Sequence, residues 1–162
     1  MTISVGSKLP GGKVLRMGEA GAEAVELEAK LKGRKVVIFG LPGAYTPTCS
    51  AQHVPGYLAK AEALRAAGID EIWCISVNDA FVMGAWARDQ KTGAKVRMLG
   101  DGSADFSKAT GLTLDLTSRG MGVRSNRYSM LVKDGKVVTL NVEGPGKFEV
   151  SDAATLLAQA KG

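Results

Sequence analysis

Short apolar runs alternate with segments of helical spacing through the middle of the chain. Three apolar runs have the length of buried strands: Val36–Phe39, Ile72–Val77 and Val96–Leu99. Between the first two, apolar residues recur every three or four positions, as on the buried side of a helix: Val54, Tyr57, Leu58, Ala61 and Leu64. A strand, a helix and a second strand predict a βαβ unit with a right-handed crossover.

Residues that favour helix ends mark the limits of the predicted helices. The first helix should follow Cys49 and run to about Ala67, where Gly68 can close it. Pro55 interrupts this helix, and a kink is expected because proline lacks an N–H and clashes with the preceding turn. Further helices are predicted after Asn78 or Asp79, at Asp105–Thr110 and after Ser151-Asp152.

Two segments predict β-hairpins. Asp134-Gly135 lies between Tyr128–Val132 and Val137–Val142, and an Asp-Gly pair favours a tight turn. The Gly-rich residues 1–35 predict a peripheral hairpin before the main sheet. The complete order predicts an α/β, thioredoxin-like fold: a central mixed β-sheet flanked by helices, with an N-terminal hairpin extension. No linker or repeat divides the chain, so residues 1–162 are expected to form a single domain.

Composition and charge narrow the class of protein. A chain of 162 residues can bury about two-thirds of its unfolded surface in one core. It has no run of the roughly 20 apolar residues that a membrane span needs. Met1–Gly6 does not resemble the start of a signal peptide, so a cytoplasmic protein is expected. The net charge of +5 comes from scattered basic residues without an aromatic platform, so neither nucleic acid nor membrane is an expected partner.

The two cysteines differ in their sequence context. They are too few for a disulfide scaffold, and the Cys-x-x-Cys motif of a thioredoxin-type electron donor does not occur. Cys49 follows a strand and a Pro/Gly-rich loop and starts a helix, where unpaired backbone N–H groups and the helix dipole stabilise a thiolate. Cys74 lies in mid-strand, a position typical of a small buried hydrophobic residue. Cys49 is therefore the predicted nucleophile.

The residues around Cys49 resemble a known family. Pro42, Thr46 and Cys49 have the spacing Pro-x-x-x-Thr-x-x-Cys, which resembles the signature of peroxiredoxins. The wider context is similar to the type II branch that includes peroxiredoxin-5, at Gly43–Ser50, His53–Tyr57, Ser76–Val82 and Arg127–Met130. The resemblance covers nearly the whole chain from Val5 onward.

This resemblance implies a thiol peroxidase that reduces hydrogen peroxide and organic hydroperoxides through a sulfenic acid on Cys49. In the family, the positions that match Arg127, Thr46 and Pro42 supply a cation beside the sulfur, a hydroxyl for the peroxide oxygens and an apolar cover. Arg127 is preferred to Arg124 because it abuts the Tyr-Ser-Met strand motif. No cofactor or metal is implied.

The resemblance also suggests partners. Glutathione with glutaredoxin, or thioredoxin, is the expected reductant. Type II relatives are often dimers, so a homodimer is expected, with Ala44, Tyr45 and the Phe81 region as contact positions. Cys74 follows Cys49 by 25 residues, the spacing of the second cysteine in type II relatives, and is a possible resolving cysteine. The C-terminal resolving cysteine of some members is missing, since residues 144–162 contain none, which favours resolution by an external thiol.

Two other interpretations stay open from the residues alone. His53, the only histidine, lies four residues after Cys49, so the two could share a helix face as the pair of a cysteine hydrolase. Zinc binding would need four ligands, and no other Cys–His cluster occurs, so a hydrogen-bonded or interfacial histidine is the preferred interpretation. A redox-sensing interaction module without turnover is the second alternative.

Overall fold

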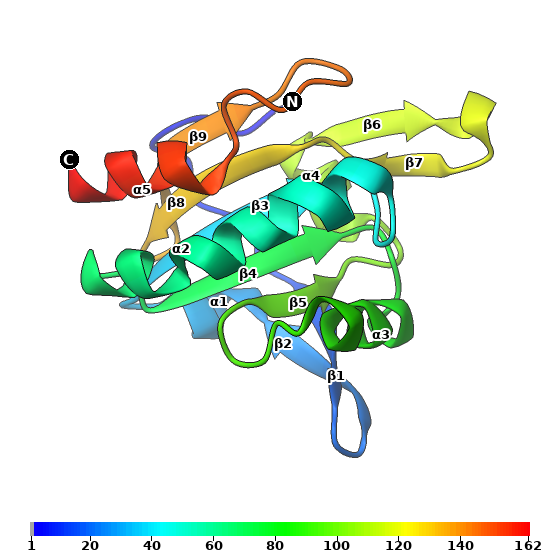
Figure 1. The fold of residues 1–162 in the computed structure, drawn as a ribbon, viewed down its shortest axis with the longest axis horizontal. Helices are drawn as coiled ribbons and strands as arrows, with labels where there is room; N and C mark the ends of the chain where they lie inside the picture. The colour runs from blue at the N-terminus through cyan, green and yellow to red at the C-terminus, as the bar shows by residue number, and fades with distance from the viewer. Residues whose placement is uncertain (1) are drawn as a thin grey trace.

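A seven-stranded mixed β-sheet forms the centre of the computed structural model, which describes residues 2–162 (Figure 1). The strand order is β2-β1-β5-β4-β3-β8-β9. Strands β3, β4 and β5 are parallel, whereas β1, β8 and β9 join by antiparallel pairing. The strands are β1 (Lys13–Gly18), β2 (Gly21–Glu26), β3 (Lys35–Leu41), β4 (Glu71–Ser76), β5 (Arg97–Gly100), β8 (Tyr128–Lys133) and β9 (Lys136–Val142).

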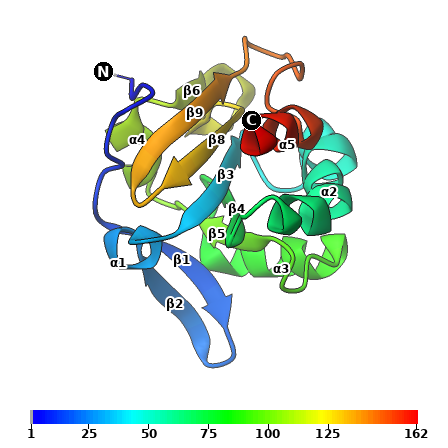
Figure 2. The ribbon, with the colours of Figure 1, turned by 90° about the vertical axis from the view of Figure 1, so that its left-hand side faces the viewer.

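Helices cover both faces of the sheet, as Figure 2 shows. One face packs against α2 (Val54–Ala66), α3 (Ala80–Gln90) and α5 (Ala153–Lys161), and the other against α1 (Leu27–Leu31) and α4 (Asp105–Thr110). Each interface is a separate apolar cluster, because alternate strand residues point to opposite faces. The predicted α/β, thioredoxin-like fold with a central mixed sheet is confirmed.

The predicted N-terminal hairpin is present as β1 and β2. It joins the sheet edge through the pairing of Leu15 with Gly100. The short helix α1 follows the hairpin, and its Leu27 and Leu31 are buried. The hairpin is therefore an edge extension of the main sheet. Within residues 2–162, no helix combines the length and the apolar character that a membrane crossing requires.

The turns and caps largely follow the sequence signals. Asp134 and Gly135 both have positive φ, 50° and 78°, as the tight turn between β8 and β9 requires. Asp79, rather than Asn78, caps α3 by accepting a hydrogen bond from Val82 N at 2.8 Å. Asp152 caps α5 in the same way.

The segment that begins at Cys49 is not a regular α-helix. Cys49–His53 forms a π-helical turn, η1, in which Val54 donates its N–H to the carbonyl of Cys49, five residues earlier. The regular helix α2 begins at Val54, immediately before Pro55. Because Pro55 has no N–H, one helical hydrogen bond is missing there, and the wide turn accommodates the gap. The interruption expected at Pro55 therefore takes the form of a π-turn that contains Cys49.

A second hairpin, which the sequence pattern did not predict, projects beyond the main sheet (Figure 1). Strands β6 (Thr113–Leu116) and β7 (Gly122–Ser125) pair with each other in a separate two-stranded sheet. A 3₁₀ turn, η2 (Thr117–Arg119), connects them. The strands are only four residues long and mostly half-buried, so they lack the alternation that identifies longer strands. This hairpin leads directly to Arg127.

Candidate active site

The loop between β3 and Cys49 is held by hydrogen bonds within itself and to α3 and the residues before it. Thr46 Oγ1 donates to the carbonyl of Gly43 at 2.8 Å, and Ala44 N donates to Asn78 Oδ1 at 3.0 Å. Tyr45 has a φ of 65°, and its hydroxyl donates to Asp89 Oδ2 of α3 at 2.7 Å. These bonds fix the loop at the carboxyl end of β3, the edge where open α/β sheets bind their ligands.

Arg127 connects this loop to the start of β8. Its Nη2 donates to Cys49 Sγ at 3.2 Å, and its Nη1 lies 2.9 Å from His53 Nδ1. Cys49 is fully buried. A guanidinium is always charged, so a permanent positive charge lies next to the Cys49 sulfur. Of the two candidate arginines, the structure places Arg127 at the sulfur.

Arg124 has different partners. Its Nε donates to the carbonyl of Met121 at 2.8 Å, and its Nη1 donates to the carbonyl of Pro42 at 3.3 Å. Arg124 therefore braces β7 against the loop and makes no hydrogen bond to Cys49 in the structure.

A cavity of about 590 Å³ opens beside Pro42, Thr46 and Arg127. Strand β6, the turn that connects it to β7, and the segment 144–147 complete its walls. Apolar and charged side chains share this lining: Leu114, Leu116, Met121, Asp115, Arg119 and Lys147. The cavity is much larger than hydrogen peroxide, and three of its four charged side chains are basic. It can therefore admit an organic hydroperoxide or an anionic thiol next to the Arg127–Cys49 pair.

His53 is buried and uses both ring nitrogens. Its Nδ1 accepts from Arg127, so the hydrogen that faces the carbonyl of Ser151 at 3.1 Å belongs to Nε2. Burial, assisted by the charge of Arg127, lowers the pKa of His53 to about 3. Neither nitrogen is directed to take a proton from Cys49. The cysteine-hydrolase pair is therefore not formed, and His53 is hydrogen-bonded as the preferred interpretation required.

Cys74 occupies the centre of the sheet. It lies opposite Phe39 of β3 and Met98 of β5, and it is fully buried in the same apolar cluster as Cys49. Burial raises the pKa of the Cys74 thiol well above its usual value; Cys49 contributes to this rise and Arg127 opposes it. Both cysteines are free thiols. Cys74 is therefore near the site but poorly suited to attack as a thiolate.

Glu143 is a site residue that the sequence analysis missed. Its buried carboxylate accepts hydrogen bonds from the backbone N–H groups of Glu149, Val150 and Ser151 at 2.8–2.9 Å, and from Ser151 Oγ at 2.7 Å. These bonds fold the segment after β9 back over the site. No local pattern marks Glu143, because its partners lie six to eight residues later in an irregular segment.

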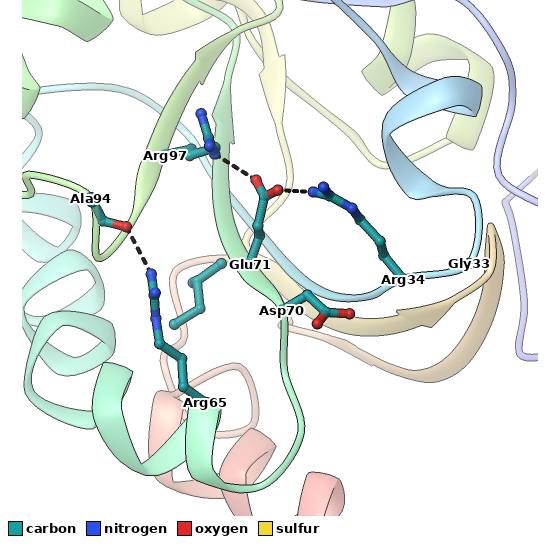
Figure 3. A pocket seen from close by; sticks show the side chains of 8 residues that line it. Gly33, Arg34, Arg65, Asp70, Glu71, Ala94 and Arg97 are labelled. Atoms are coloured by element: carbon teal, nitrogen blue, oxygen red, sulfur yellow. Dashed lines mark hydrogen bonds and ion pairs between the residues drawn. The ribbon is translucent and has the colours of Figure 1, made fainter.

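A second cavity, of about 450 Å³, lies at the opposite edge of the parallel strands (Figure 3). There Glu71, at the start of β4, forms ion pairs with Arg34 and Arg97, while Arg65 donates to the carbonyl of Ala94 at 2.8 Å. Burial acts to raise the pKa of Glu71, but the indole N–H of Trp73 and the two arginines outweigh it and lower this pKa. The cluster ties the starts of β3, β4 and β5 together. Within residues 2–162, no group of three or more His, Cys, Asp or Glu side chains is arranged to hold a metal ion.

Comparisons with known proteins identify the family of the chain. The Redoxin family model matches residues 4–157. Peroxiredoxin-2C of rice (Oryza sativa subsp. japonica) is 45% identical over 156 residues, which cover 96% of each chain. Reduced Prx3 from Vibrio vulnificus, solved in complex with hydrogen peroxide, is 45% identical with a TM-score of 0.94, covering 98% of this chain and 99% of that one.

One similar structure carries a different description. A Burkholderia cenocepacia protein, described provisionally as a thioredoxin reductase, is 60% identical with a TM-score of 0.95, covering 98% of each chain. The present chain has no Cys-x-x-Cys motif, and its sequence and fold match peroxiredoxins along nearly its whole length. The chain therefore belongs to the Redoxin family and, within it, to the type II peroxiredoxins, which makes it a thiol peroxidase.

Proposed function

We propose that Cys49 is the peroxidatic thiol and that Arg127, Thr46 and Pro42 complete its catalytic site. The observation that carries this proposal is the 3.2 Å hydrogen bond from Arg127 Nη2 to Cys49 Sγ beside a cavity that Pro42 and Thr46 also line. The Vibrio vulnificus relative that binds hydrogen peroxide has the same fold.

The reaction transfers one peroxide oxygen to sulfur. The Cys49 thiolate attacks an oxygen of the hydroperoxide, the O–O bond breaks, and the leaving oxygen takes a proton to become water or an alcohol. Arg127 stabilises the thiolate and the negative charge that develops on the oxygens. Thr46 Oγ1 donates to Gly43, so its lone pairs are free to accept a hydrogen bond from the peroxide. Pro42 lines the site without an N–H that would compete for the thiolate.

An external thiol then reduces the sulfenic acid. Its thiolate attacks Cys49 Sγ, water leaves, and a second thiol releases Cys49 from the mixed disulfide. We propose glutathione with glutaredoxin, or thioredoxin, as this reductant. Cys74 is buried and its pKa is raised, which disfavours it as the thiol that reduces Cys49. Arg119 and Lys147 on the cavity wall attract carboxylates, which favours an anionic thiol such as glutathione.

We further propose that the enzyme is a cytoplasmic homodimer. Its chemistry consumes reducing thiols, which the cytoplasm supplies. The side chains of Tyr45 and Phe81 are 51% and 66% exposed beside the active-site loop, where a second subunit could cover them.

Peroxide consumption by a Cys49→Ser variant tests the proposed function. We expect no turnover of hydrogen peroxide or cumene hydroperoxide by this variant, with either glutathione–glutaredoxin or thioredoxin as donor. A Cys74→Ala variant, which changes the other thiol, should keep most of the activity with at least one donor. Normal turnover by Cys49→Ser, with an unchanged circular dichroism spectrum, would refute the assignment. The donor that supports the faster wild-type turnover identifies the reductant class.

A further inference from the structure

A chain of hydrogen bonds links Cys49 to the folded segment after β9. Arg127 donates to both Cys49 Sγ and His53 Nδ1, and His53 Nε2 donates to the carbonyl of Ser151. Glu143 in turn holds the backbone N–H and hydroxyl of Ser151. Apart from Cys49 and Arg127, the members of this chain have no assigned part in the reaction.

Within this series of hydrogen bonds, His53 is the residue that fixes the orientation of the Arg127 guanidinium. The guanidinium carbon of Arg127 lies 5.8 Å from the centre of the Phe148 ring, so one face of the group is packed, and its Nη1 and Nη2 each have one defined acceptor. The imidazole itself is held on three sides. Phe39, Tyr57 and Phe148 lie within 4.8–5.7 Å of it, ring centre to ring centre, and the Ser151 carbonyl fixes Nε2.

The charge of the group that accepts the hydrogen bond from Arg127 is as important as the position of that group. A carboxylate at this position would also hold Arg127, but its negative charge would cancel much of the field that the guanidinium exerts on the thiolate. An imidazole that accepts at Nδ1 and donates at Nε2 carries no net charge. It can therefore orient Arg127 and leave the full positive charge available to the sulfur.

We propose that His53 is a positioning residue of the peroxidase site, which holds Arg127 against Cys49 through an uncharged acceptor. Ser151 and Glu143 form the outer support, because Glu143 fixes the backbone whose carbonyl orients the imidazole. The inference rests on the proposed roles of Cys49 and Arg127.

Three substitutions at His53 separate geometry from charge. The Oδ1 of an asparagine lies where Nδ1 of the imidazole lies, so His53→Asn keeps the acceptor for Arg127 and loses the bond to Ser151. The amide nitrogen of a glutamine matches Nε2, so His53→Gln keeps the Ser151 bond and loses the acceptor. His53→Asp has the shape of the asparagine variant but adds a negative charge.

The readouts are the single-turnover rate of Cys49 oxidation by hydrogen peroxide and the pH profile of Cys49 alkylation by iodoacetamide. We expect His53→Asn to oxidise within about threefold of wild type, and His53→Gln and His53→Asp to be at least about tenfold slower, the loss typical of a charge-assisted hydrogen bond. His53→Asp should also move the alkylation midpoint to higher pH. In an Arg127→Met background, none of the three should change the rate more than twofold.

Equal rates for His53→Asn and His53→Gln, or a wild-type rate for His53→Asp, would overturn the proposal. The nitrogen chemical shifts of the wild-type imidazole test it without any variant: a protonated Nδ1 at pH 7 would also overturn it. If the wild type did not reduce peroxide at all, the proposed function would fail. The alkylation profiles would still report whether His53 controls Cys49.

Discussion

Two arginines three residues apart contact the active-site loop in different ways. Arg127 donates to the sulfur of Cys49, whereas Arg124 donates to the main-chain carbonyls of Met121 and Pro42. A permanent charge acts on a thiolate mainly at short range, so only the first contact bears directly on the chemistry. The second contact shapes the loop.

The two arginines should therefore differ in kinetics. Arg127→Met removes a charged donor from the reacting sulfur and should slow Cys49 oxidation by about 10²-fold, the loss seen when an oxyanion-hole donor is removed. Arg124→Met should slow it far less. Stopped-flow measurements of sulfur oxidation compare the two variants directly, and the reverse ranking would show that Arg124 is the catalytic arginine.

His53 should make the fold sensitive to acid. Its pKa is about 3 in the folded protein, against 6.5 for an ordinary histidine, because burial and Arg127 disfavour the charged ring. The Ser151 carbonyl, Glu143 and Asp152 act in the opposite direction but are outweighed. Between these two pH values the unfolded chain binds more protons than the folded one, so stability falls as the pH is lowered.

Urea unfolding at two pH values measures this effect. The free energy of unfolding of wild type, relative to His53→Asn, should fall by about 2 kcal/mol between pH 7 and pH 5, because protonation of His53 in the unfolded chain alone favours unfolding progressively below its ordinary pKa. An asparagine does not titrate, so the variant removes this contribution and no other titrating group. A constant difference between the two proteins would mean that His53 has the same pKa in the folded and unfolded chains.

Among the elements, the π-turn Cys49–His53 places two site residues on one irregular segment. The sequence showed that Pro55 would interrupt the helix, because the missing N–H is a property of the residue itself. It did not show that the break would take the form of a π-turn that includes Cys49. That outcome depends on how Arg127 and Ser151 hold Cys49 and His53 from other parts of the chain.

Strand β4 holds Cys74 in a position that should exclude it from the main reaction path. Cys74 is fully buried between β3 and β5, and burial raises the pKa of its thiol, so it is poorly suited to attack a sulfenic acid on Cys49. With glutathione and glutaredoxin, Cys74→Ala should keep more than about half of the peroxidase activity. Mass spectrometry after one equivalent of peroxide should find Cys49 mainly as a mixed disulfide with glutathione. A dominant intramolecular disulfide, together with loss of activity in Cys74→Ala, would instead make Cys74 the resolving cysteine.

At the scale of the whole molecule, the sequence pattern predicted the strands that position the two cysteines. It did not predict the segments that line the active-site cavity. The strand before Cys49 and the strand that contains Cys74 were predictable because apolar runs and capping residues are local signals. The walls come from the β6–β7 hairpin and from segment 144–147, which lie far apart in sequence and meet only after folding. Glu143 acts through backbone groups of an irregular segment, which leaves no side-chain pattern to recognise.

The outer surface beside the active-site loop carries two large apolar side chains. Tyr45 lies on the loop and hydrogen-bonds to Asp89 of α3, and Phe81 lies in the first turn of the same helix. The bond from Ala44 N to Asn78 Oδ1 holds the loop against the start of α3, so both rings belong to one surface. Their exposure costs hydrophobic free energy unless another molecule covers them.

This surface should form the contact of the proposed homodimer. Phe81→Asp places a charge at its centre and should shift the protein from dimer to monomer in sedimentation-velocity experiments at micromolar concentration. Val5→Asp is the matched control, because Val5 is similarly exposed, 62% against 66% for Phe81, in the N-terminal segment away from α3 (Figure 2). Since the same surface borders the active-site loop, the monomer should also reduce peroxide more slowly. A dimer that survives Phe81→Asp but dissociates with Val5→Asp would place the interface on the opposite side of the molecule.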